Sequence, residues 1–400
     1  MDLLVLSEVR WGYFRTRKQF LLSRFPPHWR VFFAQPPAFG GDDPWTPRRE
    51  GRVTYFTVPF LKPGTKSALY NRLADTAPGR AALELAAELH LGHMLRRLGV
   101  DPEPVVLASN IYCPGTLSRL SKKLLLYDFN DSPFQFSVSP GWARGYWART
   151  VRQVRAVFVV SEFYRRQLAG ETDRPLILLG NGVEMAHFEA PRPAPADLAS
   201  LPRPLIGYVG LLSHFLDFGM LEALRRNRRG GTVVLIGPPS PATDGAVAEF
   251  GRREGVAVLG PRPYEDVPAY MQALDAGVIP FRADDPFVRG INPNKVYQYL
   301  AAGIPVVTTP VLDLQESPPD LLFATTTEEL TRALDRALDA PADRARRRAL
   351  ARSHDWDALA SRMVNEIEAR LGRPRATLPQ AGTWLERRPH RSVRRNPRAR

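Results

Sequence analysis

Short apolar runs alternate with stretches of helical periodicity along most of the chain. In the first half, runs of four to six residues are typical of buried strands and lie at 3–6, 30–35, 53–58, 104–109, 123–128 and 156–161. Between them, apolar positions recur every three or four residues through 80–99, which predicts a long helix ending at Gly99. This alternation predicts an α/β domain with a parallel sheet, closed after an Asn181–Gly182 turn.

A proline-rich stretch at 189–204 interrupts this pattern and reads as a linker. A second α/β series follows, with apolar runs at 204–210, 232–237, 256–260, 275–281 and 305–309. We therefore expect two doubly wound, Rossmann-like domains, 1–188 and 205–352, with an amphipathic helix at 355–371 completing the first. Two such domains leave a central cleft outside the carboxyl ends of their sheets, where ligands bind in this architecture.

Length and composition agree with this division. The 400 residues suit two domains, and 44% apolar residues suffice for two cores. The single cysteine, Cys113, excludes an intramolecular disulfide. The N-terminus has acidic residues and only a short apolar run, which is not the pattern of a signal peptide. No apolar run reaches the 18 residues expected of a transmembrane helix. We expect a cytoplasmic protein, or one peripheral to the inner face of the membrane.

Positive charge gathers at the end of the chain. Residues 373–400 hold nine arginines against one acid, Glu386, and so carry +8 of the formal net charge of +14. Without apolar periodicity, this segment reads as a disordered basic tail. Such a tail can bind anionic lipid or nucleic acid, or it can simply be solvated. Neither reading assigns a function to the protein.

The segment INPNKVYQYLAAGIPVVTT, residues 291–309, reads as a loop, a short helix and a buried strand. Asn292 is a suitable helix cap, and Pro293 suits the first helical position. Gly303 ends the helix, and the apolar run that follows reads as a strand. The segment therefore predicts a helix whose N-terminus points out of a polar loop.

Polar side chains crowd the first turns of this helix. Asn294, Lys295 and Gln298 fall there, and Lys295 and Gln298 share a face. The unpaired N–H groups of a helix N-terminus favour phosphate, and Lys295 adds a full charge. Gln298 can reach a neighbouring hydroxyl. The loop before the helix contains Gly290 and Ile291, and the glycine allows the backbone to approach a ligand closely. The structural alternative is an ordinary helix with polar caps.

A glycine-bearing junction opens the second half, in GYVGLLSHFLDFGMLEAL at 207–224. A strand ends before Gly210 and Leu211, and a helix begins near Asp217. Such junctions commonly admit phosphate or sugar. A plain turn explains the pattern equally well, with His214 and Asp217 as the polar groups on offer.

Carboxylates follow a strand of the first half, in LLLYDFNDSPFQF at 124–136. Asp128 and Asp131 come at the carboxyl end of the strand and hence in the cleft, where a carboxylate can act as general base toward a hydroxyl. The alternative is a capping turn before Pro133. No histidine accompanies these acids, so nothing favours a metal site.

Basic and aromatic residues interleave at 9–25, VRWGYFRTRKQFLLSRF. Gly12, Tyr13 and Arg15 there can receive an anionic or lipid-linked acceptor at a membrane surface. The alternative is an amphipathic helix with a solvated basic face. No GxSxG, Walker-type or Cys/His motif occurs, so hydrolase, P-loop and zinc readings have no support.

Taken together, these motifs resemble the GT-B glycosyltransferases, in particular the family 4-like enzymes of bacterial surface polysaccharide assembly. The resemblance spans about residues 1–372. It rests on VVSE at 159–162, NGVEMAHF at 181–188, the YVG turn at 208–210, and Pro293, Lys295 and Gln298 followed by YLAAGIPVV. The family's fold is GT-B, two Rossmann-like domains across a cleft.

Two departures from the family pattern concern charge. The family's two carboxylates, spaced by seven residues, would fall at Gly290 and Gln298, and the arginine and lysine that follow the YVG turn are absent. Glutamine can still bind ribose hydroxyls through hydrogen bonds. The Lys-x-x-Gln helix is similar to that of glucuronosyltransferases of exopolysaccharide assembly, which invert the anomeric centre and need a base. The sequence leaves retention or inversion open.

The resemblance implies a metal-independent hexosyltransferase of cell-surface polysaccharide biosynthesis that uses a nucleoside-diphosphate sugar as co-substrate and no cofactor. It implies a glycan or lipid-linked acceptor, contact with an anionic membrane surface, and no nucleic acid. Asp131 and Asp128 are the expected base candidates. The expected donor-binding residues are Gly210, Leu211, Asp217, Gly290, Ile291, Asn292, Asn294, Lys295 and Gln298. The expected acceptor-side residues are Gly12, Tyr13 and Arg15. A nucleotide-sugar 2-epimerase or hydrolase, or a non-catalytic binding protein, are the alternatives.

Overall fold

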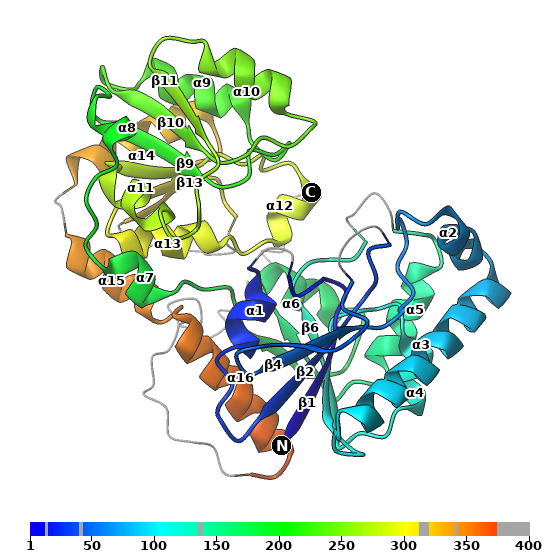
Figure 1. The fold of residues 1–400 in the computed structure, drawn as a ribbon. Coiled ribbons are helices and arrows are strands. Elements are labelled where there is room, and N and C mark those ends of the chain that lie inside the picture. The colour runs from blue at the N-terminus through cyan, green and yellow to red at the C-terminus, as the bar shows by residue number, and fades with distance from the viewer. Residues whose placement is uncertain (13–14, 40–42, 135–138, 312–319, 341–342, 374–400) are drawn as a thin grey trace, which may run out of the picture.

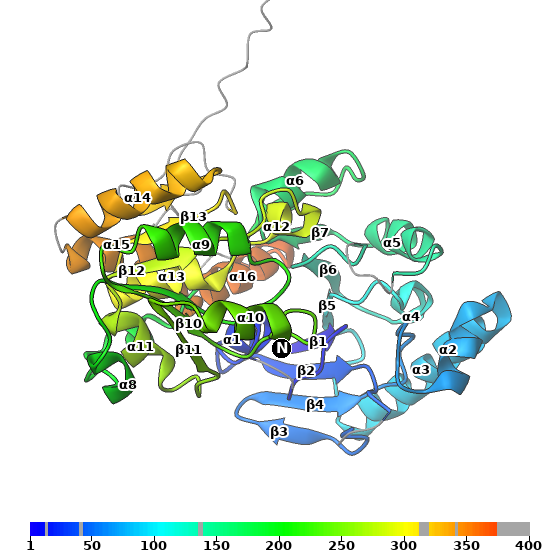
Figure 2. The same cartoon turned by 90° about the horizontal axis from the view of Figure 1, so that it is seen from above.

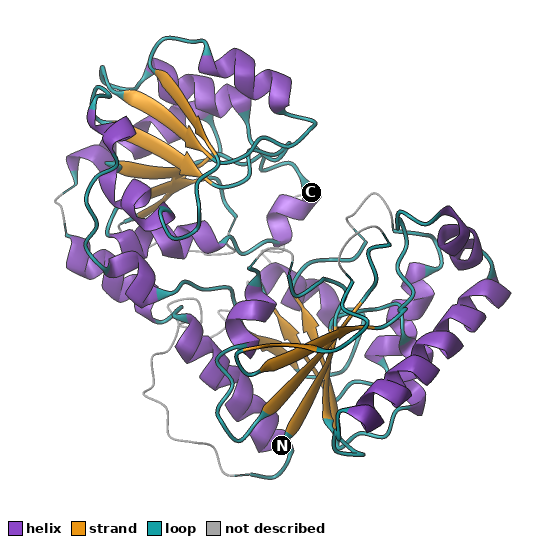
Figure 3. Cartoon of the chain, viewed as in Figure 1, coloured by secondary structure: helices purple, strands orange, loops and turns teal. Residues whose placement is uncertain are grey.

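The computed structural model describes residues 1–12, 15–39, 43–134, 139–311, 320–340 and 343–373. Its strands form two separate sheets, and helices cover both faces of each sheet (Figures 1 and 3). The prediction of two doubly wound α/β domains is confirmed. The basic tail predicted at 373–400 lies, apart from Arg373, outside the described residues.

The first sheet has eight strands in the order β3-β4-β2-β1-β5-β6-β7-β8. All neighbours are parallel except β3, an exposed strand that runs antiparallel to β4. The strands are β1 Asp2–Leu6, β2 Arg30–Gln35, β3 Arg48–Glu50, β4 Val53–Thr57, β5 Val105–Ala108, β6 Leu124–Phe129, β7 Ala156–Val159 and β8 Leu176–Leu178. The helices between them are α1 Arg17–Leu22, α2 Ala68–Asp75, α3 Ala77–Arg97, α4 Pro114–Arg119, α5 Ala143–Val151 and α6 Glu162–Ala169.

The second sheet has six parallel strands in the order β11-β10-β9-β12-β13-β14. The strands are β9 Leu205–Val209, β10 Thr232–Ile236, β11 Val256–Gly260, β12 Ala276–Ile279, β13 Val306–Thr308 and β14 Leu321–Phe323. The helices are α7 Met185–Glu189, α8 Ala196–Ala199, α9 Phe218–Arg226, α10 Asp244–Gly251, α11 Val267–Ala273, α12 Pro286–Gly290, α13 Asn294–Ala302, α14 Thr327–Asp339, α15 Arg344–Arg352 and α16 Trp356–Arg370. The proposed linker at 189–204 thus contains the short helix α8. The domain limits stay a prediction.

Both faces of the first sheet are buried, which explains its continuous apolar runs. Along β1, Leu4 and Leu6 join one core cluster, whereas Leu3 and Val5 join the cluster on the opposite face. This division follows from the alternation of side chains along a strand. No described helix is both long and apolar enough to cross a bilayer.

In each sheet the strand order reverses beside its first strand. β1 lies between β2 and β5, and β9 lies between β10 and β12. Open α/β sheets bind ligands in the crevice at such a switch point, beyond the carboxyl ends of the strands. The loops after β1, β5, β9 and β12 are therefore the places where this fold positions functional groups.

The last helix, α16, packs on the first sheet although α7–α15 accompany the second. Its apolar side chains, among them Trp356 and Leu359, belong to the same buried cluster as Leu3 and Val5 of β1. The ring of Trp356 stacks on Phe20 of α1 at 5.2 Å between centroids. The chain thus crosses between the two sheets twice.

Replacing Trp356 by alanine is expected to lower the free energy of unfolding by about 3–5 kcal/mol, because the indole is 1% exposed and its loss leaves a cavity beneath α1. The measurement is urea unfolding followed by far-UV circular dichroism. Ser361→Ala on the same helix is the control and is expected to change stability by less than about 0.5 kcal/mol. Equal midpoints for the two variants would contradict the docking of α16.

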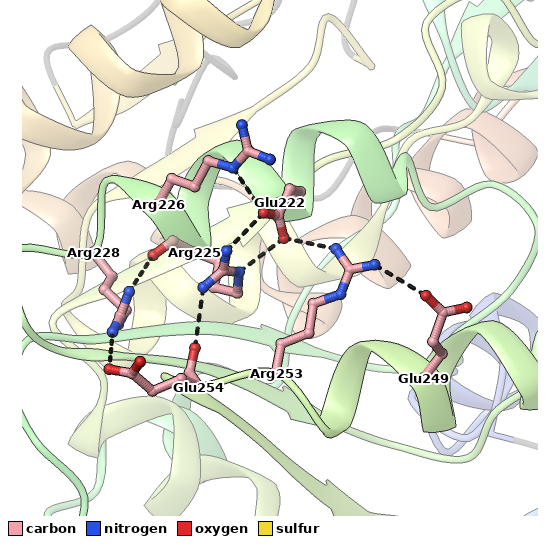
Figure 4. A network of polar contacts seen from close by, with 7 residues as sticks. All are labelled: Glu222, Arg225, Arg226, Arg228, Glu249, Arg253 and Glu254. Atoms are coloured by element: carbon pink, nitrogen blue, oxygen red, sulfur yellow. Dashed lines mark hydrogen bonds and ion pairs between the residues drawn. The ribbon is translucent and has the colours of Figure 1, made fainter.

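Ion pairs connect α9 and α10 with the turns that follow them, as Figure 4 shows. Glu222 accepts hydrogen bonds from Arg225, Arg226 and Arg253. The guanidinium of Arg225, followed by those of Arg253 and Arg226, holds the pKa of Glu222 well below its usual range. Several arginines of the second domain therefore take part in surface ion pairs, away from the switch point of the second sheet.

Candidate functional site

Lys295 lies in the first turn of α13, close to the switch point of the second sheet. A methyl group at Gly210, the residue after β9, would lie 2.7 Å from Lys295 Cε and 2.9 Å from Nζ. Gly210 also has a φ of +139°, in the range that favours glycine. Lys295 can come this close because Gly210 has no side chain. The assignment of both residues to one donor site stays a prediction.

Gly237, after β10, adds a second close approach that the sequence reasoning missed. Its φ is +142°, and a methyl group there would lie 2.0 Å from the carbonyl oxygen of Gly210. The two turns beside the switch point are thus built from paired glycines. The signal in the sequence was the glycine ending TVVLIG, which parallels the one ending GYVG.

No carboxylate neutralises Lys295 within the described part of the chain. Its Nζ lies 5.2 Å from the ring centre of Tyr208 and 5.6 Å from that of Phe281, so aromatic faces surround it. Burial lowers the pKa of Lys295 to about 8. An anion bound at this point would stabilise the charged form, and the cluster is therefore suited to a phosphate.

The N-terminus of α13 presents further groups to the same region. α13 begins at Asn294, one residue later than predicted, with Pro293 as its cap. Among the described residues, no group hydrogen-bonds the side chain of Gln298, and Asn294 Oδ1 is buried without a partner. Both amides therefore have unused hydrogen-bonding capacity at the start of α13.

Asp217 and Leu211 complete the loop after β9. The carboxylate of Asp217 accepts from the backbone N–H of Met220 at 3.0 Å and so caps α9. Leu211 is 54% exposed, and its carbonyl accepts from the hydroxyl of Tyr208. Asp217 therefore has a structural task here, and its predicted donor contact stays a prediction.

The loop at 290–292 is occupied by contacts between the two domains. The carbonyl of Gly290 accepts from the hydroxyl of Ser161 at 2.7 Å. Asn292 donates through Nδ2 to the carbonyl of Val160, and its own carbonyl accepts from Asn181. The prediction that Asn292 caps the helix is wrong, because its side chain is turned to the first domain.

Gly290 is the position at which the sequence resemblance would place a carboxylate, and the structure explains why no side chain fits there. A methyl group at 290 would lie 2.3 Å from Tyr164 Cζ and 2.5 Å from its hydroxyl oxygen. Tyr164 is fully buried on α6 and accepts from the backbone N–H of Ser132. The aromatic ring therefore fills the space that a side chain at 290 would need.

The variant Gly290→Ala is expected to lower the free energy of unfolding by about 1–3 kcal/mol through overpacking against Tyr164. Differential scanning calorimetry measures the shift. Gly141→Ala is the control, because a methyl group there meets no atom within 4 Å. The further change Tyr164→Leu should reduce the cost of Gly290→Ala; a cost unchanged by it would contradict the contact.

A cavity of about 210 Å³ opens at the switch point of the first sheet. Its walls come from the loops after β1, β2, β5 and β6 and from the segment 61–63. They are Glu8, Val9, Pro36, Leu61, Lys62, Pro63, Ser109, Asn110, Ile111, Tyr112, Tyr127, Asp128, Asn130, Asp131, Pro133 and Ser139. The wall thus combines apolar side chains with the carboxylates of Glu8, Asp128 and Asp131.

The two predicted carboxylates differ in their surroundings. Asp128 is 4% exposed and pairs with Arg17, whose Nε lies 3.2 Å from Oδ1. Asp131 is half-buried and accepts from Asn130 at 2.8 Å. Burial raises the pKa of Asp131 to about 6, against the opposing charge of Lys18. Asp131 is therefore the carboxylate that is able to exchange protons near neutral pH.

Arg17 and Lys18 are site residues that the sequence reasoning missed. The reading of 9–25 as a helix with a solvated basic face is wrong, because Arg17 and Lys18 are 2% and 5% exposed. Lys18 Nζ lies 2.7 Å from Glu8. Burial alone would lower the pKa of Lys18, but Glu8 and Asp128 outweigh it and raise the pKa. These cations hold the carboxylates of the cavity wall in place.

The predicted acceptor residues lie outside this wall. Gly12 is exposed, and Arg15 places its guanidinium 5.9 Å from the ring centre of Tyr264 in the second domain. Tyr13 lies outside the described residues. Their role in binding an acceptor stays a prediction. Within the described residues, no cluster of three metal-ligating side chains occurs.

Comparison with solved structures identifies the fold as GT-B. The chain superposes on sucrose-phosphate synthase of Thermosynechococcus elongatus with a TM-score of 0.65 at 15% identity, over 93% of this chain and 99% of that one. It superposes on HepE of Anabaena, solved with UDP, with a TM-score of 0.62 at 17% identity, over 92% and 99%.

Sequence comparison matches part of the chain. Residues 203–340 match the glycosyl transferases group 1 family. A segment of 131 residues is 32% identical to TuaH of Bacillus subtilis, a protein named as a teichuronic acid biosynthesis glycosyltransferase. The alignment covers 32% of this chain and 33% of that relative, so it spans about a third of either protein. The chain thus has the GT-B fold with a group 1 glycosyl transferase domain, and the resemblance is confirmed.

Proposed function

We propose that the protein is a glycosyltransferase of cell-surface polysaccharide biosynthesis that moves a sugar from a nucleoside-diphosphate donor to a glycan or lipid-linked acceptor. One observation carries the proposal: Lys295, without a carboxylate partner among the described residues, lies against Gly210 at the N-terminus of α13. A half-buried cation in this setting suits the diphosphate of a donor. The relatives named above support the same chemistry.

The proposed donor site divides its tasks among few residues. Lys295 and the helix N-terminus neutralise the charge that develops on the leaving diphosphate. Gln298 and Asn294 bind the ribose hydroxyls, and the paired glycines at 210 and 237 let the phosphates approach the backbone. UDP is the first nucleotide to test, because HepE was solved with it.

The proposed acceptor site is the cavity of the first domain. Asp131 takes the proton of the acceptor hydroxyl, whose oxygen then forms the new bond to the anomeric carbon of the donor. The bond from that carbon to the diphosphate breaks, and its electron pair leaves with the diphosphate. This single displacement predicts inversion at the anomeric carbon.

A donor screen tests the proposal. Nucleotide release is measured for UDP-, GDP- and dTDP-sugars with and without lipid-linked or oligosaccharide acceptors. Release that requires both donor and acceptor is the expected result. Release without an acceptor would favour the hydrolase or epimerase alternative. Nucleotide binding without turnover in any combination would contradict an enzymatic role.

A further inference from the structure

Four leucines on α2 and α3 face solvent. On α2, Leu69 and Leu73 are 71% and 39% exposed, and on α3, Leu85 and Leu89 are 53% and 66% exposed. The members of each pair are four residues apart and therefore share one helix face. Exposed Ala81, Ala82 and Ala86 extend the stripe on α3. An outward apolar face of this kind is unusual on a soluble surface.

Other side chains of both helices pack against the first domain, so the exposed leucines are not the core-facing residues of these helices. Tyr70 of α2 is buried and donates its hydroxyl to the carbonyl of Phe60. Leu91 and Met94 of α3 belong to the core of the first sheet. Trp45, 44% exposed, packs edge-on against His90 of α3.

Positive charge flanks these leucines. Lys66 and Arg72 stand at α2, and Arg96 and Arg97 stand at the end of α3; all four are exposed, and none has a carboxylate partner among the described residues. Asp75 is an exposed acid of this region, whereas Glu88 pairs with Arg119. The surface therefore complements a negatively charged partner with an apolar interior.

The position of this surface connects it with the proposed acceptor cavity. The chain runs from the cavity wall at 61–63 directly into α2, and Tyr70 binds that helix back to residue 60. α2 and α3 lie at the end of the first domain that is farthest from the second domain (Figures 1 and 2). Lys62, on the cavity wall, is also without an ion pair in the described ranges.

We propose that the outer face of α2 and α3, made of Leu69, Leu73, Leu85, Leu89 and the flanking cations, docks on the surface of an anionic lipid bilayer. The leucines enter the headgroup boundary, Trp45 lies at the interface, and the cations meet acidic headgroups. A lipid-linked acceptor would then reach the cavity beside α2 from the membrane; this step rests on the proposed function. Docking itself needs no catalysis.

Sedimentation with vesicles of phosphatidylglycerol and phosphatidylcholine tests this surface on the full chain. The wild-type protein is expected to bind vesicles containing phosphatidylglycerol and to bind pure phosphatidylcholine at least about tenfold less well. The double variant Leu85→Gln/Leu89→Gln is expected to lose at least about tenfold in partitioning. The control Val258→Thr changes a 37% exposed side chain on β11 and should bind like the wild type.

The variants keep their fold for this comparison, because all the changed side chains are exposed; unchanged thermal unfolding verifies this. Equal partitioning of the leucine variant and the wild type would overturn the proposal and would assign any binding to the C-terminal arginines. A concentration-dependent dimer that the leucine variant abolishes, seen without lipid, would also overturn it in favour of self-association. Nucleotide release with a soluble acceptor should stay unchanged, which separates this test from that of the proposed function.

Discussion

Lys295→Met is expected to lower kcat/KM for the nucleotide-sugar donor by about 10²–10³-fold, the usual effect of removing one group that stabilises developing negative charge. The substitution keeps an unbranched side chain, one atom shorter, and removes the ammonium that lies against Tyr208. Steady-state kinetics with varied donor measure the effect. Binding of UDP, measured by calorimetry, should weaken in parallel.

The pH dependence of kcat/KM gives the same prediction a second readout. Because burial lowers the pKa of Lys295 to about 8, the free enzyme loses the ammonium charge above that pH, and donor capture should fall. Bound diphosphate should raise this pKa, so kcat should fall only at higher pH. Lys123→Met, which removes an exposed lysine paired with Asp101, is the control. A Lys295→Met enzyme within about threefold of the wild type would refute the role of Lys295.

Asp131→Asn is expected to lower kcat for transfer by about 10²–10⁴-fold while leaving UDP affinity unchanged, since the amide cannot take the acceptor proton. Burial raises the pKa of Asp131 to about 6, so the base form prevails above that pH, and kcat/KM of the wild type should rise through it. This acid limb should vanish in the variant. NMR of the product should show an inverted anomeric carbon.

Asp128→Asn separates the two carboxylates. Asp128 pairs with the buried Arg17, so its loss leaves an uncompensated charge, and the expected effect is mainly on stability. A larger fall in kcat for Asp128→Asn than for Asp131→Asn, at equal folded fraction, would assign the base to Asp128. Retention of configuration in the product would remove the need for either base.

The fold could be predicted from the sequence where burial dictates the pattern. Strands such as β1 and β10 are buried on both faces, so their apolar runs are visible without tertiary knowledge. β3 was missed because its residues, RRE, are all exposed and carry no apolar signal. The final helix was recognised by its amphipathic pattern, and its docking on the first sheet follows from Trp356.

The candidate site divides in the same way. Lys295 and Gly210 were found because each stands in a local motif, a helix start and a strand-to-turn junction. Arg17 was missed because its partner Asp128 is 111 residues away, and composition alone made its segment look like a solvated helix face. Tyr164 fills the space beside Gly290 and is likewise distant from it in the sequence. The spacing of residues within a motif could not predict this contact.

A structure of the protein with UDP tests the central claim most directly, because the account assigns the diphosphate to one place. We predict a diphosphate oxygen within hydrogen-bonding distance of Lys295 Nζ, at the N-terminus of α13 and beside Gly210, with the ribose near Gln298. UDP bound elsewhere, with Lys295 still enclosed by Tyr208 and Phe281 and touching no phosphate, would contradict the account.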